Sequence, residues 1–497
     1  MRHTWIILAG LLLVFSASLG WAATSGEKPN IVFILADDLG YGDVQCYNPE
    51  RGKIPTPYID RLAAEGMMFT DAHSTSSVCT PSRYSILTGR YNWRTRLQSG
   101  VLSGYSPPLI DANRLTVPAL LKQHGYHTAC IGKWHLGMNI PRREPSPKIT
   151  DGPTTRGFDY FFGISASLDM PPFAYIENDH FTEPLTTTKT WQRTGPAAAS
   201  FEAVDVLPTL TQRAVDYITE RATTKQPFFL YLALTSPHTP IVPSKEWQGK
   251  SPLGKYGDFV MQTDWTVGQV VAAIDRAGLR ENTLVIFTSD NGCSKAARIE
   301  ELQQRGHYPS GPLRGSKSDI WDGGHRIPFI VRWPARVPAG SRCDQLVCQM
   351  DLMATCADIL GVTLPPDAGE DSVSFLPLLT GQAKEPVRRV LVHHSYYGVF
   401  ALREEQWKLA LCGGSGGWTP PSFGGPEAMA LPQTQLYNMA TDIGETNNLY
   451  AEQPERVTSM TQLLEKVVAD GRSTPGPKQA NDAPVEIRKK GKPRRRG

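Results

Sequence analysis

The chain has 497 residues, of which 40% are hydrophobic and 20% are charged, a balance that excludes a disordered or fibrous protein and allows a large buried core. The formal net charge is +3, but the last ten residues carry seven basic side chains, so residues 1–487 have a net charge of −4. We therefore expect no nucleic-acid partner, because binding to a phosphate backbone requires a basic surface.

The N-terminus has the pattern of a secretory signal peptide. Two basic residues precede an apolar run from Trp5 to Phe15, and the small residues Gly20 and Ala22 follow at the positions that a signal peptidase prefers. We assign residues 1–22 to a cleaved signal and expect an exported protein, either periplasmic or secreted. The apolar run is shorter than the roughly 20 residues that span a bilayer, so we expect no stable membrane anchor.

Hydrophobic runs that alternate with amphipathic segments predict an α/β fold. The first run, Asn30–Ala36, is continuous and rich in β-branched residues, which is typical of a strand covered on both faces in a parallel sheet. A helix is expected over 56–69, where apolar residues recur at helical spacing. The later expected elements are a helix at 117–124, a strand at 127–131, a strand at 227–237, a helix at 259–277 and a strand at 283–290. This alternation predicts a large, mostly parallel sheet flanked by helices.

The pattern changes after about residue 385. Short apolar runs with tight connections predict a small antiparallel sheet, closed by a helix near 455–468. We assign residues 23–385 to a large domain and residues 386–473 to a C-terminal subdomain. Residues 474–497 are rich in proline and then in basic side chains, and we expect them to be disordered.

Eight cysteines are scattered along the chain, without a CxxC pair or histidines at zinc-finger spacing. We therefore expect no structural zinc site. Export permits disulfides, but the sequence leaves their pairing open.

Polar residues stand where the predicted strands end. Asp37 and Asp38 follow the first strand, Asp290 and Asn291 follow the last one, and His238 follows the strand between them. In a parallel sheet these ends meet at one edge, where ligands bind. Carboxylate and amide oxygens are suited to Ca²⁺ or Mg²⁺. The first pair taken alone is explained equally well as a loop cap, but the second pair at an equivalent place favours a metal site.

A lone cysteine is usually a small buried hydrophobic residue, but the context of Cys79 indicates otherwise. The run Cys79-Thr80-Pro81-Ser82-Arg83, followed by Leu87-Thr88-Gly89, resembles the signature of type I sulfatases. The segments Gly125–Thr128 and Gly132–His135 resemble the second signature of that family. The resemblance extends from Asn30 to about residue 450 and implies an alkaline-phosphatase-like fold with residues 23–385 as the catalytic domain.

The resemblance implies that Cys79 is oxidised to formylglycine by a maturation enzyme. The hydrated aldehyde would attack the sulfur of a sulfate ester with one oxygen, and its second hydroxyl would then expel sulfate. Such a cycle avoids a stable sulfate ester on the enzyme, which would be hard to hydrolyse.

The resemblance also assigns roles to the motif residues. Ca²⁺ would be held by Asp37, Asp38, Asp290, Asn291 and an oxygen of residue 79. Arg83 would stabilise the alkoxide, while Lys133 and Lys317 would compensate the charge of the sulfate. His135 would take a proton during sulfate release, and His238 would protonate the leaving oxygen. Ser167 matches a serine that contacts the sulfate, with Ser165 as a close alternative.

Two other functions are weighed against a sulfatase. A phosphatase or phosphodiesterase of the same fold would use Ser or Thr with two zinc ions and histidine ligands, which Cys79 and Asn291 oppose. An inactive glycan-binding relative would have a broken set of motif residues, whereas this set is complete. For an exported sulfatase we expect a sulfated small molecule or carbohydrate as substrate, with Met170–Asp179 lining a sugar subsite.

Overall fold

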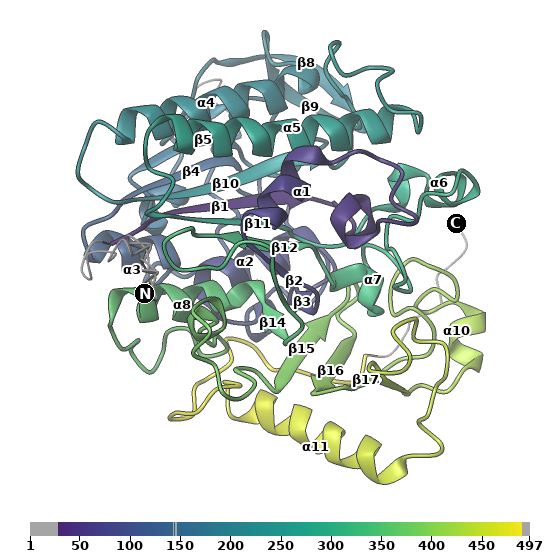
Figure 1. Cartoon of the computed structure of the whole chain (residues 1–497). Coiled ribbons are helices and arrows are strands. Elements are labelled where there is room, and N and C mark those ends of the chain that lie inside the picture. Colours follow the sequence, from purple (N-terminus) through teal and green to yellow (C-terminus); the bar gives the residue numbers. More distant parts are fainter. Residues whose placement is uncertain (1–27, 143, 145–146, 490–497) are drawn as a thin grey trace, which may run out of the picture.

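The computed structural model describes residues 28–142, 144 and 147–489 (Figure 1). The predicted signal at residues 1–22 lies outside this part of the chain. None of the helices described is long and apolar enough to cross a membrane. The eight cysteines all lie within the described residues and are all free.

A ten-stranded sheet forms the centre of the molecule, in the order β13-β2-β12-β11-β1-β10-β4-β5-β6-β7. The five strands β11, β1, β10, β4 and β5 run parallel, while β12, β6 and β7 pair antiparallel with their neighbours. The bounds are β1 Asn30–Asp37, β2 Met67–Phe69, β4 His127–Lys133, β5 Tyr160–Ile164, β6 Ile176–Glu177, β7 His180–Phe181, β10 Phe228–Pro237, β11 Thr283–Ser289, β12 Phe329–Arg332 and β13 Ser341–Cys343.

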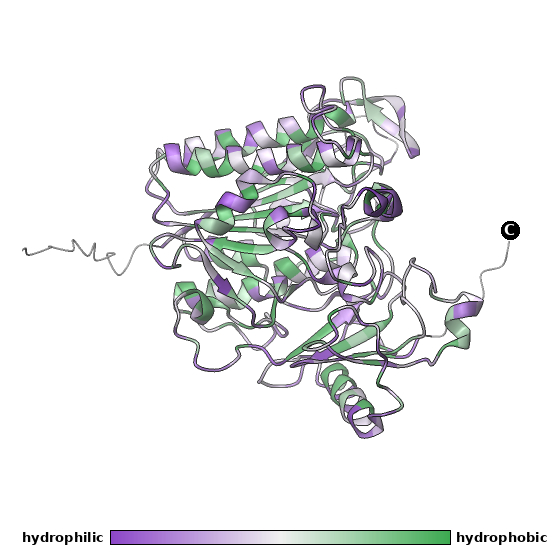
Figure 2. Ribbon diagram, turned by 45° about the vertical axis from the view of Figure 1, so that its right-hand side comes forward, coloured by the Kyte–Doolittle hydropathy of each residue, from purple (hydrophilic) through white to green (hydrophobic). Residues whose placement is uncertain are grey.

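Helices cover both faces of this sheet. In Figure 1, α4 and α5 lie above the strands and α2, α3 and α8 lie below them, which is why every residue of β1 and β10 is buried. The central strands are correspondingly coloured as hydrophobic in Figure 2. The bounds are α1 Pro57–Ala64, α2 Cys79–Thr88, α3 Val117–Gln123, α4 Val206–Arg221, α5 Lys255–Arg276, α6 Ile299–Gln304, α7 Asp322–His325, α8 Leu352–Leu360 and α9 Leu376–Leu379.

A smaller antiparallel sheet follows, as predicted, at the bottom of Figure 1. Its core is shared with the large domain, because Tyr91 and Trp93 pack among the apolar residues of these strands. Helix α11 covers the sheet through Met460 and Leu464. The bounds are β15 Val390–His394, β16 Phe400–Glu404, β17 Trp407–Ala410, β18 Gln435–Asn438, α10 Pro426–Ala430 and α11 Pro454–Ala469. Two short pairings complete the strands, β3 Ala72–His73 with β14 Val347–Cys348, and β8 Leu185–Trp191 with β9 Arg193–Ala198.

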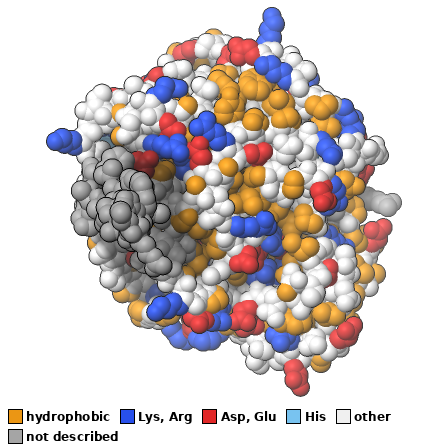
Figure 3. All heavy atoms as spheres, in the orientation of Figure 1, with side chains coloured by type: hydrophobic (Ala, Val, Ile, Leu, Met, Phe, Trp, Pro, Cys, Tyr) orange, Lys and Arg blue, Asp and Glu red, His pale blue; other side chains and the backbone are white. Residues whose placement is uncertain are grey.

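The outer surface carries charges of both signs. Figure 3 shows lysine and arginine side chains interspersed with aspartate and glutamate on the face that it presents. Opposite charges on this face therefore offset one another at short range.

The predicted helix over 56–69 is too long. Helix α1 ends at Ala64, and Met67–Phe69 form β2, which pairs with β12. Gly66 lies between them, and a Cβ atom there would lie 2.3 Å from the carbonyl oxygen of Val331. The close approach of the neighbouring strand therefore decides the conformation, not the helical spacing of the apolar residues.

The expectation of disorder from residue 474 does not hold for residues 474–489. Asp482 accepts a hydrogen bond of 2.9 Å from Nη2 of Arg90, and Asn481 accepts one of 3.0 Å from Nη1 of Arg94. Val485 and Ile487 pack against the core of the C-terminal subdomain. Hydrogen bonds to two buried arginines and apolar contacts therefore hold this segment against the rest of the folded chain.

Arg94 connects the turn after α2 to the C-terminal part of the chain. Its guanidinium donates to both oxygens of Asp371 at 2.8 Å and to the carbonyl oxygen of Val467 at 3.2 Å. Burial alone would raise the pKa of Asp371, but Arg94 lowers it overall. Both side chains are fully buried.

Replacing Arg94 with alanine leaves the Asp371 carboxylate buried without its cation. We expect the free energy of unfolding, measured by urea denaturation, to fall by about 3–5 kcal/mol. The control is Arg61→Ala, which removes an ion pair to Glu65 from a side chain that is 67% exposed and should cost less than about 1 kcal/mol. Equal losses for the two variants would contradict the prediction.

Candidate active site

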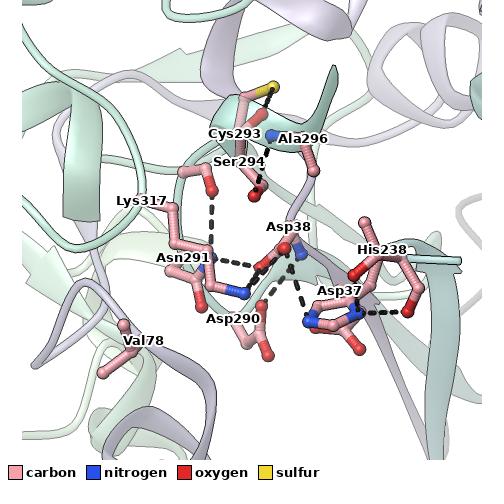
Figure 4. A network of polar contacts seen from close by, with 12 residues as sticks. Asp37, Asp38, Val78, His238, Asp290, Asn291, Cys293, Ser294, Ala296 and Lys317 are labelled. Atoms are coloured by element: carbon pink, nitrogen blue, oxygen red, sulfur yellow. Dashed lines mark hydrogen bonds and ion pairs between the residues drawn. The ribbon is translucent and has the colours of Figure 1, made fainter. Parts of the chain in front are cut away.

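The ends of four parallel strands bring the predicted site residues together. Asp37 ends β1, Lys133 ends β4, His238 follows β10 and Asp290 follows β11. The register aligns the strand ends, since Asp37 pairs with Pro237 and the preceding residue of β1 pairs with Ser289. Figure 4 shows Asp37, Asp38, Asp290 and His238 converging on one region.

Cys79 is the first residue of α2, a helix in which every side chain is buried. The extended backbone of Val78 starts the helix, and Gly89, with φ of 62°, ends it in the left-handed conformation. Burial raises the pKa of the Cys79 thiol to about 12. An unmodified thiol is therefore protonated at neutral pH and is a poor nucleophile.

Each buried carboxylate of the site has its own cation. Lys133 Nζ donates to Asp37 Oδ2 at 2.7 Å, and Lys317 Nζ donates to Asp38 Oδ2 at 2.7 Å. The third pair joins Arg83 and Asp290, with hydrogen bonds of 3.1 Å from Nε and 2.8 Å from Nη2 to the same carboxylate oxygen. All of these residues are less than one-tenth exposed, so their charges interact across little solvent.

These pairs oppose the effect of burial on ionisation. Burial would raise the pKa of Asp37, but Lys133 and the neighbouring cations hold it far below its usual range. Burial would lower the pKa of Lys317, but Asp38 raises it above its usual value. Burial, followed by the charge of Asp37, raises the pKa of Asp290, so this carboxylate is less favoured in its charged form than Asp37.

Two oxygens of the predicted metal ligands lack hydrogen-bond donors from the part of the chain that the structure describes. They are Oδ1 of Asp37 and Oδ1 of Asn291, and both are shielded from solvent. Asn291 is oriented by its Nδ2 group, which donates to Asp38 Oδ1 at 2.8 Å. Ligand atoms of Asp37, Asp38, Cys79 and His238 lie within 4.8 Å of one another. Hard oxygen donors in this arrangement fit Ca²⁺.

The two histidines of the site have different proton positions. His135 donates from Nε2 to the carbonyl oxygen of Leu102 at 2.8 Å, so its Nδ1 is the free basic nitrogen. His238 donates from Nδ1 to the carbonyl oxygen of Thr239 at 2.7 Å, and its Nε2 lies 3.6 Å from Asp38 Oδ2. Burial lowers the pKa of both histidines, assisted by Lys133 for His135 and by Lys317 for His238.

Three residues at the same place have a strained backbone. Asp38, His135 and Ser318 have φ angles of 64°, 56° and 83°, which L-residues adopt at a free-energy cost. Gly132 precedes Lys133 because a Cβ atom at this position would lie 1.8 Å from the carbonyl oxygen of Ala233. The folded chain therefore holds the site residues in positions that local preferences disfavour.

A cavity of about 530 Å³ opens above these residues. Its lining includes Cys79, His135, Ser167, His238 and Lys317, which are five of the predicted residues. The others, Asp37, Asp38, Arg83, Lys133, Asp290 and Asn291, are almost fully buried. The structure thus brings the whole predicted set to one place.

The two candidate serines differ in position. Both hydroxyls are buried and lack partners among the described residues, but only Ser167 is among the residues that line the cavity. The predicted sugar-lining segment Met170–Asp179 contributes only Met170, because Phe173 and Ile176 are buried in the core.

Sequence reasoning missed the residues that form the walls of the cavity. They are Val101, Asp169, Gln192, Arg193, Thr239, Ser294, Lys295, Ala296, Tyr396 and Trp418, together with Val78 beside the cysteine. They come from segments far apart in the chain and share no motif. The one signal in the sequence that could have pointed to these walls was a tryptophan at the end of a glycine-rich stretch, Gly413–Trp418.

The fold and the site define a hydrolase of the alkaline-phosphatase-like class, and the comparisons identify the family. The Sulfatase family model matches residues 29–362, and the model described as N-sulphoglucosamine sulphohydrolase, C-terminal, matches residues 316–410. The chain belongs to the sulfatase family and is a sulfuric ester hydrolase.

Individual relatives are similar over most of their length. An N-acetylgalactosamine-6-O-sulfatase of Bacteroides thetaiotaomicron is 34% identical over 89% of this chain and 94% of its own length. Human arylsulfatase A is 35% identical, over 94% of this chain and 93% of its own. One solved structure comes from work on the metabolism of multiple glycosaminoglycans by B. thetaiotaomicron. It has a TM-score of 0.80 and 33% sequence identity, and the match covers 89% of this chain and 99% of that one.

Proposed function

We propose that this protein is an exported sulfatase that hydrolyses sulfate esters of carbohydrates with a formylglycine at residue 79 and one Ca²⁺. One observation carries the proposal. The first residue of α2 lies within 4.8 Å of Asp37 and Asp38, beside three buried cations and a cavity that a substrate can enter.

The formylglycine is supported by the chemistry of residue 79. The cysteine thiol has a pKa of about 12, so it is neither a thiolate nucleophile nor a good metal ligand as it stands. A hydrated aldehyde at this position supplies two hydroxyl groups, one for attack on sulfur and one for release of sulfate. The maturation enzyme that forms it would be the partner of this chain, acting on the motif Cys79–Arg83.

The metal proposal rests on the oxygen donors. Asp37, Asp38, Asp290, Asn291 and an oxygen of residue 79 would hold Ca²⁺. When bound, the ion supplies positive charge that stabilises an ionised hydroxyl and the oxygens of the sulfate. Arg83 fixes Asp290 through two hydrogen bonds, so its proposed role is to orient a ligand as well as to compensate charge.

The roles of the remaining residues are proposed from their charges and from the atoms that can exchange a proton or donate a hydrogen bond. Lys317 lines the cavity and Lys133 is buried beside Asp37, and the charge of both would attract the sulfate. The free Nδ1 of His135 accepts a proton when sulfate is released. Nε2 of His238 lies beside Asp38, where it can protonate the leaving oxygen, and the negative charge of bound sulfate favours its protonated form. Ser167 would donate its hydroxyl hydrogen to the sulfate.

A carbohydrate substrate is supported by the relatives. The relative from B. thetaiotaomicron is named for N-acetylgalactosamine 6-sulfate, and a crystal structure of Ps i-CgsB, 26% identical with a TM-score of 0.69, contains k-i-k-neocarrahexaose. Human steryl-sulfatase is 32% identical to this chain, so sequence similarity alone does not distinguish a carbohydrate substrate from a steroid one. Export through residues 1–22 places such an enzyme in the periplasm or the medium, where sulfated glycans are encountered.

The formylglycine is tested on the tryptic peptide Leu62–Arg83 of active protein. We expect mass spectrometry to show a species lighter than the cysteine form that reacts with an aldehyde reagent. The Cys79→Ala variant is the control, and it should lack both the adduct and the sulfatase activity. Full activity with wholly unmodified Cys79 would contradict the proposal.

The metal is tested by removal and replacement. Chelation should abolish sulfatase activity, and Ca²⁺ should restore it better than Zn²⁺, because the proposed ligands are oxygens. Elemental analysis of active protein should give one calcium per chain. Two bound zinc ions with phosphatase activity would favour the phosphatase alternative, and a protein inactive on every ester despite bound calcium and formylglycine would favour an inactive glycan-binding relative.

The acid role of His238 is tested by comparing leaving groups. A sugar alkoxide needs a proton to leave sulfur, whereas a nitrophenolate with its low pKa leaves unaided. His238→Ala should therefore lose about 10²–10⁴-fold in kcat on a sugar sulfate and much less on nitrophenyl sulfate. Lys317→Ala is the matched comparison, and it should impair both substrates similarly because it removes charge from the sulfate site. An equal loss on both substrates for His238→Ala would move the acid role to Lys317.

A further inference from the structure

The cavity has two unlike walls above the proposed sulfate site. One wall comes from the large domain and consists of Asp169 and the β8–β9 hairpin, whose tip carries Gln192 and Arg193. The other wall comes from the C-terminal part of the chain and carries Tyr396 and Trp418. Substrate atoms beyond the sulfate group would occupy the cavity that residues of both parts line.

Arg193 is a donor that is held in place at the cavity. Its Nη1 group donates to Oδ2 of Asp169, and Asp169 is 5% exposed, so the carboxylate is a rigid support. The Arg193 side chain is 52% exposed, which leaves other N–H groups of the guanidinium accessible. Oδ1 of Asp169 has no donor among the described residues, so both Asp169 and Arg193 can form further hydrogen bonds to a ligand.

The hairpin that carries Arg193 is fixed to the body of the protein. Phe173 exchanges backbone hydrogen bonds with the hairpin, donating to Pro196 at 2.9 Å and accepting from Ala198 at 3.0 Å. The ring of Trp191 packs against Phe173, with centroids 4.9 Å apart, and against Phe201. Arg193 is therefore positioned before a substrate binds, which lowers the entropy lost on binding.

Trp418 is the second lining residue that the protein holds in place. Its backbone N–H donates at 2.9 Å to both Ser318 Oγ and Asp319 Oδ1, which directly follow the site residue Lys317. Its half-buried ring contacts Tyr396, with centroids 5.0 Å apart, and Nζ of Lys295 lies 5.2 Å from the ring centroid. Because these two acceptors directly follow Lys317 in the chain, the position of Trp418 is coupled to that of the proposed sulfate site.

We propose that Arg193 and Trp418 form the subsite for the sugar ring that carries the sulfate, with Asp169 as the residue that positions Arg193. The proposal rests on the sulfatase function proposed above. Trp418 offers its face to the C–H groups of the ring, and Arg193 donates to hydroxyl or acetamido oxygens. The charge of Arg193 is balanced by Asp169, which favours an uncharged acceptor over a second anion. A steroid or aryl sulfate lacks the acceptors that this pair requires.

The test uses the formylglycine- and Ca²⁺-loaded enzyme with N-acetylgalactosamine 6-sulfate and nitrophenyl sulfate. Arg193→Gln should raise KM for the sugar sulfate about 10- to 100-fold, since a hydrogen bond from a charged group is lost, with a much smaller effect on nitrophenyl sulfate. Its kcat on the sugar should change little, because the role proposed for Arg193 is to bind the ring and not to act on the sulfate.

Separate variants test Trp418 and the positioning residue Asp169. Trp418→Ala should raise KM for the sugar sulfate roughly tenfold. The matched control is Trp247→Ala, which removes another half-buried tryptophan with a lysine, Lys250, over its ring at 4.6 Å. Asp169→Asn should raise KM as Arg193→Gln does, and the double variant should be no worse than Arg193→Gln alone, because Asp169 acts through Arg193.

The outcomes separate this subsite from the underlying function. If the wild-type enzyme hydrolyses the sugar sulfate but Arg193→Gln raises KM equally for both substrates, or for neither, the subsite is refuted and the sulfatase function stands. Additive effects of Asp169→Asn and Arg193→Gln would refute the positioning role. If the loaded wild-type enzyme hydrolyses nitrophenyl sulfate but no sugar sulfate, the carbohydrate function itself fails.

Discussion

Three carboxylates buried at one edge of a sheet must be neutralised, and the architecture of the site follows from that requirement. An isolated buried charge is unstable, so Asp37, Asp38 and Asp290 are each matched by a lysine or arginine at hydrogen-bonding distance. The three cations come from different parts of the chain: Arg83 from α2, Lys133 from β4 and Lys317 from the loop before α7. The charge pairs therefore fix the relative positions of the helix that carries residue 79, the sheet and the loop that reaches the C-terminal subdomain.

The parallel arrangement of the central strands is what gathers these charged residues into one site. Strands β11, β1, β10 and β4 are neighbours in the sheet although they are far apart in sequence, so their carboxyl ends deliver Asp290, Asp37, His238 and Lys133 to one edge. An antiparallel sheet would send alternate ends to opposite edges. The helix that begins with Cys79 completes the arrangement from one face, because Arg83, one turn further on, is anchored to Asp290 and to the carbonyl oxygen of Lys133.

The sequence predicted the parts of the molecule that depend on short contiguous patterns. Cys79, Arg83 and the acids at the strand ends lie in such patterns, and the structure brings them together. The helix over 56–69 was too long because the close strand at Gly66 is a tertiary constraint. The order of residues 474–489 depends on acceptors for Arg90 and Arg94, and the cavity walls depend on a hairpin and a distant tryptophan. None of these relations leaves a periodic or motif-like trace in the sequence.

The charge balance of the site also bears on the oxygen nucleophile that we propose for residue 79. Burial raises the pKa of Cys79, and the three carboxylates and three cations of the site sum to zero, so no net positive charge offsets that effect of burial. A divalent cation added to this neutral set would leave two positive charges. A sulfate monoester carries one negative charge and an ionised hydroxyl at residue 79 carries another, so the loaded site returns to zero. The positive charge of a bound divalent cation would therefore favour an ionised hydroxyl at residue 79, and the anionic substrate would complete the charge balance.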